Sequence, residues 1–189
     1  MLRAAADLMH LRGVQGTSVD DVLVASGTGK SQFYRYFGSK GDLVRAVLQY
    51  QMQEWVKRSG PLLAHLDTWQ GFETWFQRIV AFQSRRGFLG GCPVGSMAAE
   101  MADLEDTLRR DLVGAFKVRR GYVAQGLARM KERGDLVGSA DPEKLSDFVI
   151  AAIQGALLLA ATEKDSGVLK NTLDHVLAHL RSFATTRQA

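Results

Sequence analysis

The sequence predicts an all-α fold of about nine helices, and three observations support this prediction. Only three prolines occur in the 189 residues, and long stretches contain no cluster of turn-forming residues. Apolar residues recur at the three- and four-residue spacing of an amphipathic helix along most of the chain. With 46% hydrophobic and 23% charged residues, the composition is that of a globular protein long enough to bury a substantial core.

Three short helices and the start of a longer one are expected near the N-terminus. Gly13 is placed as the C-cap of the first helix, and Thr17–Asp20 has the pattern of a capping box for the second. Gly27 permits the tight turn before the third helix. Ser39–Asp42 is a further capping box and begins a longer connecting helix. The three short helices are expected over residues 2–11, 18–25 and 29–37.

The rest of the chain predicts a second all-helical domain. Gly60–Pro61 is expected to break the connecting helix, and Gly87–Gly95 is a second break. Asp141–Pro142 is a strong start signal, with Asp as N-cap and Pro in the first helical position. The helix that follows is apolar nearly all round, so we expect a second subunit to cover it. The expected helices include one that carries Phe72, Trp75, Phe76, Ile79 and Phe82, and others over 96–103, 104–133, 142–163 and 169–183.

Composition and charge exclude several classes of protein. Arg3 and Asp7 interrupt any apolar core of a signal peptide. The longest apolar run, 148–161, is shorter than a membrane span, so a cytoplasmic protein without membrane contact is expected. The sequence has one cysteine, four scattered histidines, no phosphate-binding loop and no metal-ligand spacing. We therefore expect no enzyme, no cofactor and no metal site, while the net charge of +4 is compatible with nucleic acid.

The segment Gly27–Phe37 has the properties of a helix-turn-helix. In this motif the second helix enters the major groove while the first crosses the DNA backbone. Ala25 and Gly27 suit the turn, and Phe33 and Phe37 supply a buried side. From residue 27 to residue 45, four basic residues stand against one acidic residue, an excess that favours phosphate contact. The side chains expected to face outward are Lys30, Gln32, Tyr34 and Arg35.

Two functional details follow from the same segment. The amide of Gln32 can pair bidentately with adenine, which makes it the candidate for reading a base. Ser39 and Lys40 open a helix whose N-terminal amides can hold a phosphate. Two alternatives are a three-helix packing module with Tyr34 and Phe37 as core, and a helical binding protein that has lost its DNA reader.

The stretch from Ala25 to Leu43, ASGTGKSQFYRYFGSKGDL, resembles the signature of the TetR (tetracycline-repressor) family. The preceding Ala-Ala-Asp-Leu, Gly13 and Thr17–Ser18 lie at the spacings usual in that family. Gly29 stands where a serine commonly caps the recognition helix, and Thr28 stands where a branched apolar residue is usual; Thr28 or Ser31 is an alternative cap. The resemblance implies that Tyr34, Lys40 and a hydroxyl of Thr17 or Ser18 hold phosphates. The complete set of expected DNA contacts is Thr17, Ser18, Thr28, Lys30, Ser31, Gln32, Tyr34, Arg35, Ser39 and Lys40.

The second domain also resembles known proteins. Gly91–Glu100, GCPVGSMAAE, and the later Gln154–Ala156 are similar to the LmrA/YxaF-like branch of the same family. This implies a domain that binds an apolar or aromatic small molecule, and a homodimer through the last two helices, about residues 141–184. Gln83 and Gln154 are candidate polar anchors. The side chains expected to line a cavity, or else to be simple core, are Trp75, Phe76, Ile79, Met97, Met101, Phe116, Tyr122 and Gln154.

Together these features predict a ligand-responsive transcriptional repressor. Residues 1–48 form its DNA-binding domain, and residues 49–189 form its ligand-binding and dimerisation domain. Its partners are double-stranded palindromic operator DNA, a small apolar or aromatic effector and a second copy of the chain. Cys92 has two interpretations, a packing residue beside a glycine break or a reactive thiol at a helix N-terminus. His175 and His179 have the spacing of a metal pair without an evident third ligand, which favours a solvated or interface face.

Overall fold

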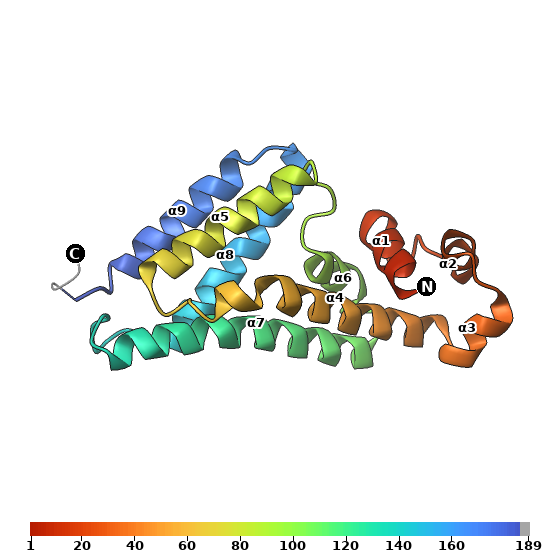
Figure 1. Cartoon of the computed structure of the whole chain (residues 1–189), viewed down its shortest axis with the longest axis horizontal. Helices are drawn as coiled ribbons and strands as arrows, with labels where there is room; N and C mark the ends of the chain where they lie inside the picture. Colours follow the sequence, from red (N-terminus) through yellow and green to blue (C-terminus); the bar gives the residue numbers. More distant parts are fainter. Residues whose placement is uncertain (186–189) are drawn as a thin grey trace. The chain divides into compact units, whose positions relative to one another are not determined.

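The computed structural model describes residues 1–185, and that part of the chain forms nine helices without an extended strand (Figure 1). One isolated bridge joins Leu136 and Ala184. The all-α prediction is therefore confirmed for these residues. The helices are α1 (Leu2–Arg12), α2 (Val19–Ser26), α3 (Lys30–Tyr36), α4 (Lys40–Leu63), α5 (Trp69–Arg85), α6 (Pro93–Met101), α7 (Asp106–Glu132), α8 (Pro142–Glu163) and α9 (Gly167–Arg181).

The chain folds into two compact units. Unit 1 consists of residues 1–57 and 92–115, and unit 2 consists of residues 58–91 and of the chain from residue 116 onwards. Unit 1 therefore contains α1–α3, most of α4, α6 and the first part of α7. The expected domain boundary after residue 48 lies inside α4, because that helix continues without interruption beyond it.

Unit 1 is organised around apolar side chains from its first four helices. Ala5 of α1, Val22 of α2, Leu43 and Val47 of α4 are all fully buried, and Phe33 of α3 is 1% exposed. This common core fixes the three short helices, which are too short to be stable alone.

Within unit 2, α9 packs against both α5 and α8, and the three lie side by side in Figure 1. An ion pair of 2.6 Å between Arg181 Nη2 and Glu73 Oε1 joins α9 to α5. Helix α7 approaches the turn after α4 closely at Gly126, where a Cβ would collide with the carbonyl oxygen of Leu66. Arg129 of α7 also reaches Asp67 of that turn at 3.3 Å.

Three expected helix boundaries are corrected. The N-cap of α2 is Ser18 instead of Thr17, since Thr17 is fully buried and turned into the loop. Pro61 does not break α4, which continues to Leu63, a residue that is 1% exposed and held by packing. Helix α6 begins at Pro93, three residues before the expected start, with Cys92 as N-cap.

Helix α8 begins as expected at Asp141–Pro142. The Asp141 carboxylate accepts hydrogen bonds of 3.2 Å from the amides of Glu143 and Lys144. By length and composition, this 22-residue helix is long and apolar enough to cross a membrane. The length of its apolar run predicts the opposite. Within the protein, 44% of its most apolar window is buried. A mostly buried core helix meets the same criteria.

Candidate nucleic-acid interface

The turn between α2 and α3 depends on Gly27. Its φ of +64° places it in the left-handed region, and nothing lies within 4 Å of the position of a Cβ, so conformation and not space requires glycine here. The amide of Thr28 donates to the Leu23 carbonyl at 3.1 Å and closes the turn. At the other end of α2, Ser18 and Asp21 form a reciprocal capping box.

Helix α3 packs into the core of unit 1 through one buried side chain. Phe33 is 1% exposed, while the other six residues of this fully described helix are all exposed. The Phe33 ring contacts Tyr34 and Phe37, with centroid distances of 5.2 and 5.5 Å. Phe37, expected on the buried side, is half-buried. The helix therefore presents nearly its whole circumference to solvent.

The start of α3 has no side-chain cap. Gly29 is the N-cap residue, as its place in the sequence suggested, and makes no capping hydrogen bond. The hydroxyl of Thr28, an alternative cap, lies 2.7 Å from the Ser26 hydroxyl instead. The first amides of α3 are thus left for water or an external acceptor.

Most of the expected DNA contacts are accessible, but Thr17 is not. Thr17 is fully buried and its hydroxyl donates to the Gly13 carbonyl at 2.8 Å. Ser39 is exposed and caps α4, where its hydroxyl accepts from the Asp42 amide at 3.1 Å. Thr28 and Lys40 are half-buried. The exposed members of the set are Ser18, Lys30, Ser31, Gln32, Tyr34, Arg35 and Ser39.

Acidic side chains at the start of α2 also shape the charge beside α3. The ammonium of Lys30 lies 3.3 Å from the Asp20 carboxylate, and both side chains are well exposed. The hydrogen bond from the Ser18 hydroxyl, followed by that from its amide, lowers the pKa of Asp21. The sequence did not identify Asp20 as part of this surface, because Asp20 and Lys30 come together only through the turn between α2 and α3.

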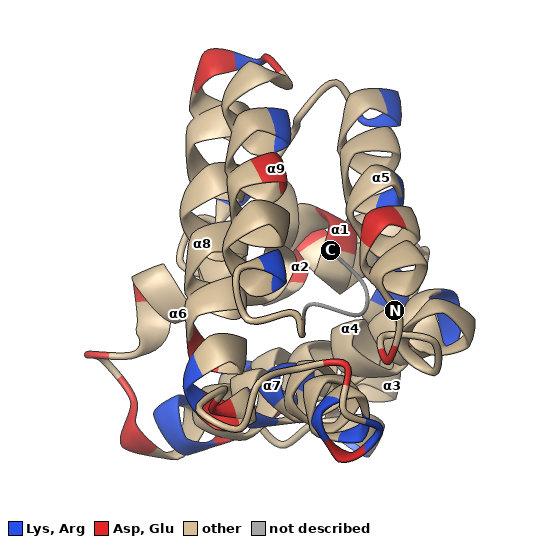
Figure 2. Ribbon diagram, turned by 90° about the vertical axis from the view of Figure 1, so that its left-hand side faces the viewer, with Lys and Arg blue, Asp and Glu red and all other residues tan. Residues whose placement is uncertain are grey.

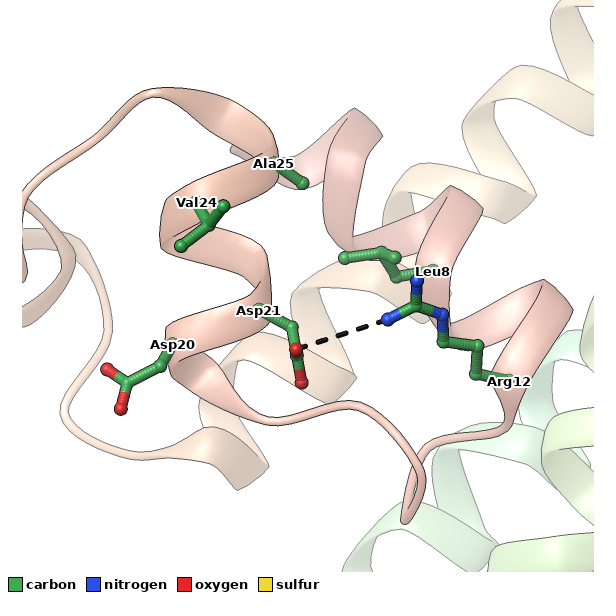
Figure 3. Close-up of a pocket in the computed structure, with 6 residues that line it drawn as sticks. All are labelled: Leu8, Arg12, Asp20, Asp21, Val24 and Ala25. Carbon is green, nitrogen blue, oxygen red and sulfur yellow. Dashed lines mark ion pairs between the residues drawn. The ribbon is translucent and has the colours of Figure 1, made fainter.

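A hollow of about 320 Å³ lies between α1 and α2 (Figure 3). The Arg12–Asp21 ion pair, with 4.0 Å between Nη1 and Oδ1, spans it. Most of its lining is exposed, including Val24 at 83%, so it is an open surface feature and not an internal ligand cavity. It is lined by Leu8, Arg12, Asp20, Asp21, Val24 and Ala25.

The expected effector-binding side chains are distributed over both units. Met97, which is buried, and Met101, which is half-buried, lie on α6 in unit 1. The others belong to unit 2, where Trp75 and Phe76 are buried on α5 with ring centroids 5.3 Å apart. The half-buried members of the set in unit 2 are Ile79, Phe116, Tyr122 and Gln154.

Gln83 is the polar side chain of α5 that the sequence suggested as an anchor. It is 5% exposed, and its Nε2 donates to the Gly91 carbonyl at 3.3 Å. Its Oε1 is buried and receives no hydrogen bond from the described part of the chain. A buried amide oxygen without a donor is well suited to a ligand that carries a hydroxyl or N–H group.

Cys92 caps α6, and His179 of α9 packs against two aromatic rings. Cys92 is 9% exposed, and its Sγ accepts from the Gly95 amide at 3.4 Å as the N-cap of α6. The His179 ring lies between Phe148 and Phe183, with centroid distances of 4.9 and 5.4 Å. Among the described residues, no group of three or more His, Cys, Asp or Glu side chains is arranged to hold a metal ion.

One face of α8 is apolar and exposed. Figure 2 shows a long part of this helix without charge, and its sequence has no charged residue from Phe148 to Thr162. Leu158 is 67% exposed, Leu159 47% and Phe148 42%. His179 covers Phe148 in part, but Leu158 and Leu159 remain more exposed than an apolar helix face normally is.

Comparison with known proteins decides the family. Residues 1–47 match the family model described as "Bacterial regulatory proteins, tetR family", and residues 71–176 match that of the "Tetracyclin repressor-like, C-terminal domain". The chain belongs to the TetR family. The two matched segments correspond to the helix-turn-helix and to most of the second domain, so the protein is a helix-turn-helix transcriptional regulator and its family is not one of enzymes.

Individual relatives of this TetR-family regulator agree with the assignment. The HTH-type transcriptional regulator in the lacX 3′ region of Lactococcus lactis subsp. lactis is 31% identical, over 92% of this chain and 88% of that protein. LmrA of Bacillus subtilis, also an HTH-type transcriptional regulator, is 26% identical over 88% of this chain and 87% of its own length. YxaF of the same organism is 22% identical over 87% and 85%.

Solved structures at 24% identity show the same fold. The regulatory protein TetR from Rhodobacter sphaeroides aligns with a TM-score of 0.86 at 24% identity, covering 94% of this chain and 95% of that one. The reduced form of Escherichia coli NemR aligns with a TM-score of 0.84 at 24% identity, covering 98% and 95%.

Proposed function

We propose that this TetR-family regulator is a ligand-responsive repressor that binds a palindromic operator as a homodimer and releases it when a small apolar or aromatic effector binds. The observation that carries the proposal is the exposure of α3. Among the residues described for this helix, Phe33 is the one that is buried, and Lys30, Gln32 and Arg35 are exposed and accessible to a groove. A helix with this pattern has little use in packing.

The proposed DNA contacts divide by role. Ser18, Tyr34, Ser39 and Lys40 contact phosphates, and Lys30 does so after exchanging its pairing with Asp20 for one with DNA. Gln32 reads a base edge. Thr17 is left out because its hydroxyl is buried. Thr28, Ser31 and Arg35 flank the reading surface.

The proposed homodimer uses the apolar face of α8 together with α9. Pairing this face with its counterpart on a second chain removes Leu158 and Leu159 from water, which stabilises the dimer. Two copies of α3 then face one side of the DNA, and we expect inverted half-sites about one helical turn, or slightly more, apart. A regulator of this kind acts in the cytoplasm.

The proposed effector is apolar or aromatic with at least one hydrogen-bond donor. Trp75 and Phe76 provide apolar surface on α5, and the buried Oε1 of Gln83 accepts the donor. Effector binding favours an arrangement in which the two copies of α3 no longer fit successive grooves. DNA release is then a shift in population between the two arrangements.

The test starts from DNA selected by the wild-type dimer from a random duplex pool. We expect an inverted repeat whose binding weakens steeply with salt, because phosphate contacts release counterions. Lys40→Ala should weaken binding to all sequences alike and reduce the salt slope by about 1. Gln32→Ala should instead change preference at one base position, by about 1–3 kcal/mol. Selection of no sequence, a shallow salt dependence or a uniform loss in Gln32→Ala contradicts the respective part of the proposal.

A further inference from the structure

A carboxylate from α6 holds the loop between α1 and α2. The amide of Val14 donates to Glu100 Oε2 at 2.7 Å, and the amide of Gln15 donates to Glu100 Oε1 at 2.6 Å. The partners are 86 and 85 residues apart in the sequence. Hydrogen bonds from neutral amides to an ionised acceptor are shorter and stronger than those to a neutral one. Both oxygens of one carboxylate are thus used on two successive amides.

Gly13 makes room for this contact. A Cβ at Gly13 would lie 2.9 Å from Glu100 Oε2 and 3.2 Å from Oε1, and the φ of +79° is also unfavourable for any other residue. The carbonyl of Gly13 accepts from the buried Thr17 hydroxyl at 2.8 Å. The loop is therefore fixed by Glu100 at one end and by Thr17 at the other.

This loop leads directly into the DNA-reading helices. Ser18, the residue after Thr17, is the N-cap of α2 and one of the proposed phosphate contacts. Helix α2 has eight residues, and its far end continues through Gly27 into α3. The position of the loop therefore sets where both short helices begin.

We infer that Glu100 is a positioning residue for DNA binding. It lies in the segment that matches the C-terminal domain of the family, whereas the two amides that it holds lie in the segment that matches the DNA-binding domain. A side chain of α6 thus completes the geometry of the DNA-reading helices within unit 1. This inference rests on the proposed function, since it concerns the same operator complex.

The direction of the change in DNA affinity distinguishes positioning from simple electrostatics. Removing a carboxylate makes a DNA-binding unit more positive, so charge alone predicts that Glu100→Gln and Glu100→Ala bind DNA more tightly. Positioning predicts the opposite. We expect the Kd for the DNA duplex selected by the wild-type protein to rise about 5- to 30-fold in both variants, with an unchanged salt slope because no phosphate contact is lost.

Two further variants control for charge and for side-chain length. Asp103→Asn removes a nearby exposed carboxylate of the same unit and should bind as charge alone predicts. Glu100→Asp keeps the charge but is one methylene shorter, so it should bind DNA weakly, like Glu100→Gln. If Glu100→Asp binds DNA with wild-type affinity, the length of the Glu100 side chain is not required, and the inference is overturned.

A matched pair of glycine variants tests the contact independently of charge. Gly13→Ala should displace the Glu100 carboxylate and weaken DNA binding. Gly134→Ala also places an alanine at a positive φ, +82°, but nothing lies within 4 Å of its Cβ position. It should leave DNA binding unchanged.

Amide exchange measured by NMR on the full chain without DNA gives the structural readout. We expect the Val14 and Gln15 amides to exchange at least about tenfold faster in Glu100→Ala, Glu100→Gln and Gly13→Ala than in the wild type or Gly134→Ala. Unchanged exchange shows that Glu100 does not hold the loop and overturns the inference. Faster exchange with wild-type or tighter DNA binding also overturns it. If the wild-type protein selects no DNA, the proposed function fails first and the positioning role fails with it.

Discussion

Helices α3 and α8 differ in how many interactions fix them. Among the seven described residues of α3 only Phe33 is buried, and its N-cap Gly29 provides no side-chain hydrogen bond. Helix α8 has 22 residues, a capping carboxylate from Asp141 and buried side chains along its length. The proposed reading element thus depends on one anchor, whereas the proposed assembly element has many. Elements that bind ligands are often drawn from the less stable parts of a protein.

The largest expected effect is the loss of the anchor of α3. Phe33→Ala should lower the free energy of unfolding by about 3–5 kcal/mol, because it empties a fully packed site. It should abolish DNA binding while the proposed α8–α9 dimer persists. Urea unfolding, electrophoretic mobility shift and sedimentation measure the three quantities. Tyr36→Ala, an exposed aromatic of the same helix, is the control and should change stability by less than about 0.5 kcal/mol.

A charge on the exposed face of α8 should separate the subunits. Leu158→Glu places a carboxylate in the proposed interface, where desolvation costs several kcal/mol, so the dimer Kd should rise at least about 100-fold. Sedimentation velocity at micromolar concentration measures it. Leu104→Glu is the control, because Leu104 is 60% exposed and lies before α7. A Leu158→Glu protein that stays dimeric would place the interface elsewhere.

Adding a side-chain cap to α3 tests whether its uncapped start limits the stability of the helix. Gly29→Ser should stabilise the helix by only a few tenths of a kcal/mol, because glycine is itself an acceptable N-cap. Exchange of the α3 amides should slow slightly, with little change in the midpoint of global unfolding. The same measurement on α8 amides should show no change. A large gain in stability would mean that α3 is less well anchored than Phe33 suggests.

The smallest expected effect is the response to acid of two helix starts, that of α2, which precedes α3, and that of α8. Hydrogen bonds from Ser18 lower the pKa of Asp21 at the start of α2, and the backbone hydrogen bond from Lys144 lowers the pKa of Asp141 at the start of α8. A carboxylate with a lowered folded pKa stabilises the protein above its unfolded value of about 4, and this contribution is lost as the pH falls further.

Stability below about pH 4 should therefore decline at both helix starts. Asp21→Asn and Asp141→Asn should each flatten the decline measured by thermal unfolding between neutral and acidic pH. A steep decline that neither variant changes would assign acid sensitivity to other carboxylates, such as Asp67. Desolvation raises the pKa of Asp67, but the hydrogen bond and charge of Arg129, a backbone hydrogen bond and the charge of Arg133 together outweigh this, and the net shift is downward.

Local sequence signals predicted much of the fold correctly. Gly13 and Gly27 end α1 and α2 in conformations with positive φ, and Asp141–Pro142 begins α8. Each of these features acts within four residues along the chain, so the sequence pattern carries it directly. The expected outward-facing residues of α3 are also exposed, because one helical turn around Phe33 defines the buried side.

Predictions failed where packing between distant segments decides the outcome. Thr17 and Ser18 are both good caps, and the burial of Thr17 selects Ser18. Pro61 is normally a break, but the packing of Leu63 keeps the last turn of α4 helical. Glu100 could not be identified, because its partners are some 86 residues away and its neighbours on α6 give no sign of them.

Pro61 has a mechanical consequence. The boundary between the two units runs through α4 after Lys57, and backbone hydrogen bonds from residues 58–61 back to 54–57 would cross it. Proline has no N–H, so the Lys57 carbonyl has no donor four residues further on, and one of these backbone hydrogen bonds is absent. Helix α4 thus lacks one backbone hydrogen bond near its end, and a helix bends more easily where a proline interrupts its hydrogen bonds.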